Sequence, residues 1–382
     1  MVRARAVLAS SALLLASAAI AGAFAQANTP NSGTSSWNSQ VEMPGKADAA
    51  KPKPKTFAKP QTTPAPKSGK GAPLPPVASE SAPTPLTPGP QRRGFQLAPV
   101  TGDDAALIAF SQGQFLTALS LAEQRAALGD AAAHTMVGRI YAEGLGVKRD
   151  EIVAARWYAR GAELGDVEGM FAIGSMLVEG TGIEKDVDAA SQMFEKAART
   201  GHVLANYNLG LMFLTGRGKP ENPIRGARHI MYAAEQGLAV AQYDLATLYI
   251  EGQGVRHDAY EAARWMRRAA EQGLGEAEFD YGVMLLRGQG LNVDVPKAVD
   301  YLKAAANKGI AGAQNRLAYI FLDPARHDRD AAEAVKWRIL AREGGLDDKP
   351  LDKAIAALPA ADRTTGEQRA RAWRERSVLD IR

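Results

Sequence analysis

The side chains that could do chemistry in this chain are scattered rather than grouped. The five histidines are His134, His202, His229, His257 and His327, and they show neither an HExxH spacing nor a pairing with carboxylates. A GxSxG nucleophile elbow and a G-x-x-x-x-G-K-[ST] phosphate loop are both absent from the sequence. The chain has no cysteine, which excludes disulfides, cysteine metal sites and a lipid-modified terminal cysteine. We therefore expect no enzyme activity, no metal site and no cofactor.

The strongest candidates for binding are aromatic residues that recur every 36 positions. They are Phe171, Tyr207, Tyr243 and Phe279, and beside them run Ser175, Leu211, Thr247 and Val283. Two interpretations stand together. Aromatic side chains at regular spacing can pack between adjacent helices, or they can anchor a peptide or a partner loop in a groove.

The elements that position these residues are pairs of helices. In Ala241 to Gly273, apolar residues recur at three and four spacings on both sides of Gly252-Gln253-Gly254, which predicts a helix, a glycine turn and a second helix. Six such windows start at constant 36-residue intervals and end at Gly345; their first residues are Asp130, Asp166, His202, Leu238, Leu274 and Ile310. A fixed period of this length is typical of a solenoid.

Three further features of the windows support stacked helix pairs. Each window ends in a glycine, which can end a helix in the left-handed conformation. Small residues recur near the start of the second helix, at Ala154, Ala190, Gly226, Ala262, Ala298 and Ala334, and large ones fill complementary places. A single pair cannot cover its own apolar stripes, so neighbouring pairs must stack. The fold class we predict is all-α, a right-handed α-solenoid of helix-turn-helix repeats.

Two segments resemble Sel-1-like repeats, a branch of the tetratricopeptide superfamily. They are MVGRIYAEGLGVKRDEIVAARWYARGAELG, from Met136, and LATLYIEGQGVRHDAYEAARWMRRAAEQG. The resemblance rests on the GxGV loop, on Asp150 or Asp258, on the tryptophan and on the final glycine, and it covers residues 130–345. The last repeat departs from the pattern, because Pro324 and Arg326 stand where the loop glycines should be.

The tetratricopeptide arrangement implies that the first helix of each pair lines the concave side of the solenoid. The aromatic ladder then belongs to a concave groove, with the third repeat as its most apolar part. The predicted partner-binding residues are Phe171, Leu204, Tyr207, Leu211, Leu214, Tyr243, Thr247 and Phe279.

Residues 1–25 predict a secretory signal peptide. Arg3 and Arg5 precede an apolar run, and Ala23-Phe24-Ala25 offers a cleavage site before Gln26. An uncleaved membrane anchor is the alternative, because the run nearly reaches the roughly 20 residues that a spanning helix needs. We expect a periplasmic or secreted protein, in contact with a membrane only through this segment.

Residues 26–100 predict a linker that stays disordered, because they are rich in proline and lysine and poor in apolar residues. It is either a solvated spacer or a basic tether that touches an anionic polymer or lipid headgroups. Its lysines contribute to the net charge of +4, so the excess of positive charge does not indicate a nucleic-acid interface.

The ends of the solenoid predict caps. Residues 101–129 form a capping hairpin, with Asp103 or Asp104 as a helix cap and Gly113 in the turn. Residues 346–382 form capping helices, predicted as Lys349 to Leu358 and Thr364 to Ser377 with a break at Pro359. The arginines of the last helix, Arg369, Arg371, Arg374 and Arg376, are read as a solvated face that could also dock on an acidic partner.

Three functions remain open. The first is a monomeric periplasmic adaptor or regulator that binds a protein, as the resemblance implies through the rhizobial exopolysaccharide regulator ExoR, which restrains a sensor kinase. The second is a scaffold in polysaccharide export or cell-envelope assembly. The third, an enzyme on a repeat fold, lacks a nucleophile, base or metal set, and the fold alone does not decide among them.

Overall fold

The computed structural model describes residues 104–326 and 329–379, which contain sixteen helices and no strand. An N-terminal pair consists of α2 (Ala105–Ser111) and α3 (Phe115–Ala127). Six further pairs follow: α4 (Ala131–Glu143) with α5 (Glu151–Glu163), α6 (Val167–Glu179) with α7 (Val187–Arg199), α8 (Val203–Thr215) with α9 (Pro223–Glu235), α10 (Ala239–Glu251) with α11 (Ala259–Glu271), α12 (Gly275–Arg287) with α13 (Val295–Asn307), and α14 (Ala311–Leu322) with α15 (Ala331–Glu343). The chain ends in α16 (Lys349–Ala356) and α17 (Ala360–Leu379).

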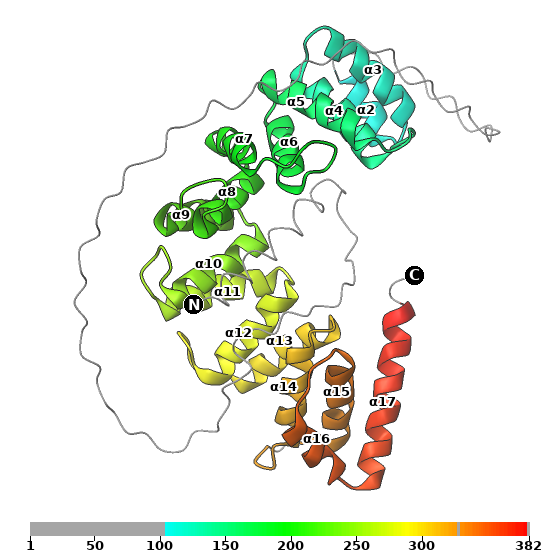
Figure 1. Cartoon of the computed structure of the whole chain (residues 1–382). Coiled ribbons are helices and arrows are strands. Elements are labelled where there is room, and N and C mark those ends of the chain that lie inside the picture. The colour runs from blue at the N-terminus through cyan, green and yellow to red at the C-terminus, as the bar shows by residue number, and fades with distance from the viewer. Residues whose placement is uncertain (1–103, 327–328, 380–382) are drawn as a thin grey trace, which may run out of the picture.

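The helix pairs stack side by side along a curved path that runs from α2 to α17 (Figure 1). Helices α6 and α8 lie on the inner side of the curve, and α7 and α9 lie on its outer side. Each pair packs on the pairs before and after it, so the fold is the predicted α-solenoid with a 36-residue period.

Small side chains set the distance between the two helices of a pair. Ala154, Ala190, Ala262, Ala298 and Ala334 are all fully buried at the predicted close approach. Gly226 stands at the same place in α9, where an added Cβ would lie 2.7 Å from the Leu214 side chain. The small residues predicted from the sequence therefore mark the contact between first and second helices.

The turn between the helices of a pair is built the same way in every repeat. The N-cap residue of the second helix accepts a hydrogen bond from a backbone amide of the first turn through its side chain; these residues are Asp150, Asp186, Asn222, Asp258, Asp294 and Asp330. The backbone amide of the same residue donates to a carbonyl near the end of the first helix, as Asp150 does to Tyr141 at 3.0 Å. Each turn is thus fixed at both ends.

The second glycine of each loop rests against the preceding repeat. At Gly290, with a φ of 71°, an added Cβ would lie 1.9 Å from the carbonyl oxygen of Ala259 at the start of α11. Gly182, Gly218 and Gly254 meet the starts of α5, α7 and α9 at similarly short distances. Backbone therefore touches backbone at these junctions, and a side chain would push neighbouring repeats apart.

The last repeat departs from this plan, as its sequence predicts. Helix α14 is one residue shorter than the other first helices, and its C-cap is Asp323 in an extended conformation rather than a left-handed glycine. The amide of Asp330 nevertheless donates to the Phe321 carbonyl at 3.2 Å, as in the other repeats. The change is therefore confined to the loop itself.

The caps differ from the predictions in detail. Asp104 is the N-cap of α2 but makes no side-chain capping hydrogen bond, and Asp103 lies outside the described residues. Helix α16 ends two residues before the predicted Leu358, and α17 begins directly after Pro359 rather than at Thr364. A proline in front of a helix costs no hydrogen bond, because the first amides have no partner within the helix.

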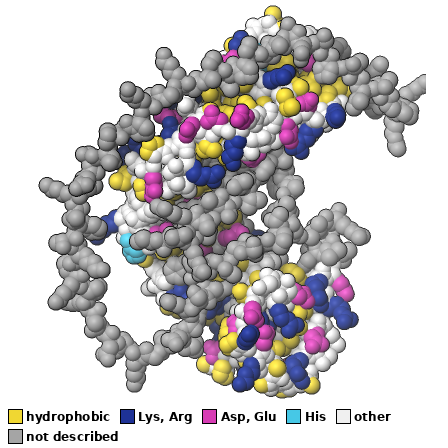
Figure 2. All heavy atoms as spheres, viewed as in Figure 1, with side chains coloured by type: hydrophobic (Ala, Val, Ile, Leu, Met, Phe, Trp, Pro, Cys, Tyr) yellow, Lys and Arg dark blue, Asp and Glu magenta, His cyan; other side chains and the backbone are white. Residues whose placement is uncertain are grey.

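Helix α17 packs across α15 with very little space between them. An added Cβ at Gly366 would lie 2.4 Å from the Val335 side chain. Arg369 pairs with Asp330 at 2.7 Å and Arg374 with Glu343 at 2.9 Å, while Arg371 is exposed. Figure 2 shows basic and acidic side chains interspersed at this end of the molecule. Two of the predicted solvent-facing arginines therefore also hold α17 to α15.

The predicted signal peptide and linker lie outside the described residues. Among the helices of residues 104–326 and 329–379, none combines the length and apolar character needed to span a bilayer.

We predict that Gly290→Ala destabilises the protein more than Gly309→Ala. Both glycines have a positive φ, which costs an L residue about 1–2 kcal/mol. A Cβ at Gly309 has open space around it, whereas one at Gly290 collides with the Ala259 backbone. The collision adds about 1–3 kcal/mol to the loss. Urea unfolding of both variants measures the difference, and equal losses would show that the repeats separate without cost at this junction.

Candidate functional site

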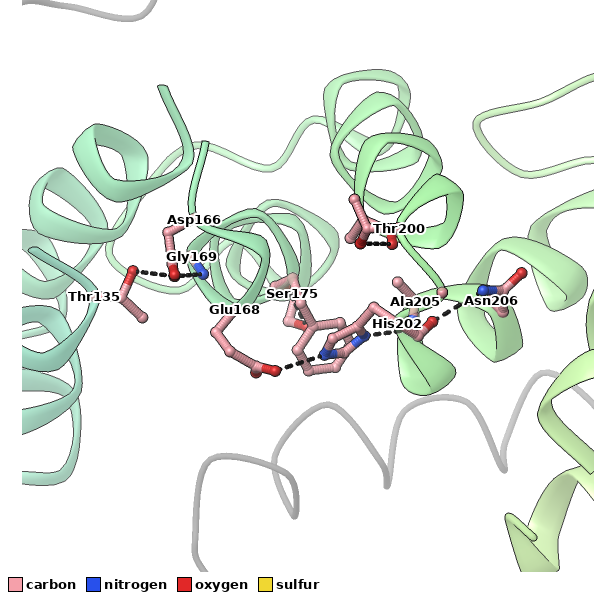
Figure 3. A network of polar contacts seen from close by, with 12 residues as sticks. Thr135, Asp166, Glu168, Gly169, Ser175, Thr200, His202, Ala205 and Asn206 are labelled. Carbon is pink, nitrogen blue, oxygen red and sulfur yellow. Dashed lines mark hydrogen bonds and ion pairs between the residues drawn. The ribbon is translucent and has the colours of Figure 1, made fainter. Parts of the chain in front are cut away.

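The inner junctions between repeats are held by polar contacts, as Figure 3 shows for α4, α6 and α8. The Thr135 hydroxyl donates to Asp166 Oδ2 at 2.6 Å, and the same oxygen accepts from the Gly169 amide at 2.7 Å. One carboxylate therefore caps α6 and ties it to α4.

At the next junction, His202 likewise caps one helix and contacts the neighbouring one (Figure 3). Its Nδ1 accepts from the Ala205 amide at 3.0 Å and caps α8, while its Nε2 lies 3.2 Å from Glu168 Oε1. Because Nδ1 accepts, the proton of the neutral ring is on Nε2, which donates to Glu168. That hydrogen bond holds the pKa of Glu168 below its usual value. The ring also stacks on Phe171, with 4.7 Å between centroids.

The predicted partner-binding residues differ widely in exposure. Phe171, Tyr207, Leu211 and Leu214 are buried, and Tyr207 is completely so. Leu204, Tyr243, Thr247 and Phe279 are half-buried. The four buried residues pack between helices, which is the other interpretation that the sequence leaves open. The role of all eight residues in partner binding stays a prediction.

Two tyrosines of this ladder bind aspartates of the following repeat. Tyr207 on α8 donates to Asp244 on α10 at 2.8 Å, and Tyr243 on α10 donates to Asp280 on α12 at 2.8 Å. In both pairs the partners are 37 residues apart, one more than the period. These aspartates were not predicted from the sequence, although an aspartate one place beyond the next ladder position was a usable signal.

Burial controls the charge of these aspartates. Burial raises the pKa of Asp244, which is 3% exposed, and the Tyr207 hydrogen bond offsets part of that rise, so that the pKa is about 7. Asp280 is more accessible, and its pKa is about 6, because burial raises it, the Tyr243 hydrogen bond lowers it and nearby Glu276 raises it. Helix α12 thus carries closely spaced acids.

The inner helices are acidic as a group. Arg287 is the one basic residue in the sequences of α6, α8, α10 and α12, whereas exposed or half-exposed acids recur on them. These acids are Glu168, Glu179, Glu251, Glu276 and Asp280. We call the side formed by the first helices α6, α8, α10 and α12 the first-helix face. Its chemistry suits a partner with basic groups.

A second set of polar residues, which was also not predicted from the sequence, connects three repeats to the repeats before them. Asn206, Gln242 and Gln314 occupy the same place in α8, α10 and α14, and their side-chain amides donate to the carbonyls of Ala198, Ala234 and Ala306. These carbonyls belong to the last turns of second helices, where backbone acceptors lack partners. Glu278 holds the same place in α12 and instead pairs with Lys308.

Within the described residues, no group of three or more histidine, aspartate or glutamate side chains is arranged to hold a metal ion. The first helices instead form a long surface with hydrogen-bonding and charged groups.

The family of this chain follows from the repeats. The Sel1 repeat model matches six consecutive segments: residues 131–166, 167–202, 203–238, 239–274, 275–310 and 311–346. These segments make up more than half of the chain, which therefore belongs to the Sel1-repeat family. Each starts one residue after a predicted window, so the predicted period and phase are confirmed. Repeats of this family form protein-interaction modules.

Solved structures share the fold. One is a protective antigen present in uropathogenic Escherichia coli strains, with a TM-score of 0.61 and 24% identity over 72% of this chain. The matched part spans 62% of that antigen's length, and at this identity the likeness concerns the fold alone. A Sel1 repeat protein from Oxalobacter formigenes has a TM-score of 0.56 and 28% identity, with 63% of this chain and 98% of that one covered. A comparison with curated proteins found no match.

We predict that His202→Ala costs about 1–2 kcal/mol of stability, because it removes the cap of α8. His202→Asn should recover about 1 kcal/mol of that loss, since Asn222 already caps α9 in the same way. Chemical denaturation of the two variants separates capping from the other contacts of the ring. Equal losses would mean that the Phe171 stacking and the Glu168 contact outweigh the cap.

We predict that stability falls as the pH rises from about 4 to 7, in part because of Asp244. The pKa of this carboxyl rises from 3.8 to about 7 on folding, so the folded state binds more protons across that window. Above pH 7 its contribution is constant. His229 opposes the trend near pH 6.5, because burial lowers its pKa. Asp244→Asn should flatten the fall in denaturation midpoint between pH 4.5 and 7.5, and an unchanged slope would contradict the assignment.

Proposed function

We propose that this protein is an exported interaction module, a periplasmic adaptor or regulator that acts in envelope or exopolysaccharide signalling by binding another protein. Membership of the Sel1-repeat family supports the interaction role. The signal-like residues 1–25 support export. A sensor-kinase ectodomain is the partner class that the family analogy suggests.

The observation that carries the proposal is the first-helix face. Its acids lie on α6, α10 and α12, and neighbouring first helices are fixed to each other by hydrogen bonds such as Tyr207 to Asp244 and Tyr243 to Asp280. A surface of this kind is pre-organised, so its own side chains lose little conformational entropy when a partner binds. The outer helices offer a contrast, because α9 carries Arg225 and Arg228 and α11 carries Arg264, Arg267 and Arg268.

The half-buried residues of the predicted site lie on the same set of helices. They include Leu204 on α8, which carries no acid, Thr247 on α10 and Phe279 on α12. A partner loop with lysine or arginine beside an apolar side chain would satisfy both kinds of group. Apolar anchors supply most of the energy in such contacts, and charges at the rim set the rate and the specificity.

We predict that Glu251→Lys combined with Glu276→Lys abolishes capture of the partner. Both side chains are exposed on the first-helix face, so the substitutions reverse its charge without opening a cavity. Cells producing the C-terminally tagged full chain are crosslinked, and the proteins that co-purify are identified for wild type and variant. A kinase ectodomain supports the regulator, whereas components of glycan export or envelope assembly support a scaffold.

The matched control is Glu271→Lys with Asp300→Lys, which makes the same change in net charge at exposed positions of α11 and α13. The control should capture the partner as wild type does. Loss of capture in both double variants, or in neither, would refute binding through the first-helix face.

A further inference from the structure

A cavity of about 600 Å³ lies on the second-helix side of the solenoid, between the third and fourth repeats. Helices α9, α10 and α11 and the loop before α11 enclose it. Its lining residues are Met231, Glu235, Tyr249, Val255, Arg256, Asp258, Glu261, Arg264 and Trp265. The cavity is distinct from the first-helix face on which the proposed function rests.

The lining of this cavity is partly apolar and partly polar, and several of its charged groups already have partners. Met231, Val255 and the rings of Tyr249 and Trp265 form the apolar part. Asp258 caps α11, and Arg264 is bound by Glu261 at 3.0 Å. Burial, followed by the charges of Glu261 and Asp258, raises the pKa of Tyr249, which reflects the negative surroundings.

Glu235 adds an acid at the rim that has no ion-pair partner in the part of the chain the structure describes. The lining thus combines apolar side chains with three acids, Glu235, Asp258 and Glu261, and two arginines, Arg256 and Arg264, which leaves one negative charge in excess. A bulky apolar side chain flanked by cationic residues is the group that fits it.

The preceding repeat has different side chains at this place. The residues 36 positions before Met231 and Val255 are Glu195 and Lys219, which form an ion pair of 2.6 Å. His229 stands there in place of Trp265. Met231 and Val255 therefore present apolar side chains beside Trp265 where the preceding repeat has an ion pair.

The chain itself contains a sequence with the required chemistry. Residues 55–59 read Lys-Thr-Phe-Ala-Lys, so one aromatic residue stands between two lysines. Trp37 has no basic neighbour of this kind. Phe95 follows two arginines but lies only nine residues before Asp104, a span of about 30 Å at most.

The length of chain between each phenylalanine and α2 decides whether Phe57 or Phe95 can occupy the cavity. Helices pack about 8–10 Å apart, so three intervening helix pairs place the cavity roughly 40 Å from α2. The residues from Phe57 to the start of α2 can span on the order of 150 Å. Phe57 can therefore reach the cavity, and Phe95 cannot.

We propose that residues 55–59 of the same chain bind in this cavity, with Phe57 against Met231, Val255 and Trp265 and with the two lysines beside Glu235 and Glu261. The N-terminal segment is then attached to the outer side of the third and fourth repeats. This leaves the first-helix face free for a partner.

The absence of cysteine allows a direct test in the full chain. Ala58→Cys is combined with Tyr260→Cys, an exposed position between the lining residues Asp258 and Glu261. The control combines Ala58→Cys with Ile152→Cys, the exposed residue at the same place in the first repeat. Mild oxidation followed by non-reducing electrophoresis gives the rate of intramolecular disulfide formation for each pair.

We predict that the Ala58→Cys/Tyr260→Cys pair forms its disulfide about tenfold faster than the control pair, because binding raises the local concentration of the two thiols. An unbound segment would favour Ile152→Cys, which is closer to its point of attachment. Adding Phe57→Ala should remove the preference. Met231→Glu with Val255→Lys should do the same, because these substitutions introduce the ion pair of the preceding repeat.

Equal rates, faster closure in the control, or a preference that survives Phe57→Ala would each overturn the proposal. Disulfide-linked dimers whose yield rises with protein concentration would also overturn it, because they would assign the cavity to the segment of a second copy. Thermal denaturation of each variant confirms that the solenoid remains folded.

Discussion

The contact on which the solenoid depends most is one between backbones. The second glycine of each loop lies against the first turn of the second helix in the preceding repeat, at Gly182, Gly218, Gly254 and Gly290. A residue with a side chain would meet two obstacles there, the positive φ and the neighbouring carbonyl. Backbone therefore limits how closely neighbouring repeats approach at these four junctions.

This close approach of the repeats has consequences for the inner helices. It brings each first helix alongside the next, so that a tyrosine hydroxyl reaches an aspartate one place further on in the following repeat. The same alignment buries Asp244 and leaves it with a raised pKa. A buried carboxyl group costs stability when it ionises, and a hydrogen bond from tyrosine offsets only part of that cost.

The sequence alone predicted the period, the phase and the places of close approach, because these depend on residue size and on glycine. It could not predict which ladder residues are buried. Tyr207 and Tyr243 occupy equivalent positions in the repeat and donate to equivalent aspartates, yet Tyr207 is fully buried and Tyr243 is half-buried. The length of α17 was underestimated because residues 360–363, Ala-Ala-Asp-Arg, are too few to show a helical pattern of their own, and the helix they join packs on α15.

In a chain whose backbone repeats so regularly, function has to reside in the positions that break the repeat. Glu195 with Lys219 and Met231 with Val255 stand at equivalent places, and the first pair closes the surface with an ion pair while the second opens a cavity. The acids of the first-helix face are likewise unevenly distributed, with none on α8 and several on α12. The scaffold holds both sets of residues at fixed separations, and it is their deviation from the consensus, rather than the consensus itself, that distinguishes this protein from another solenoid of the same period.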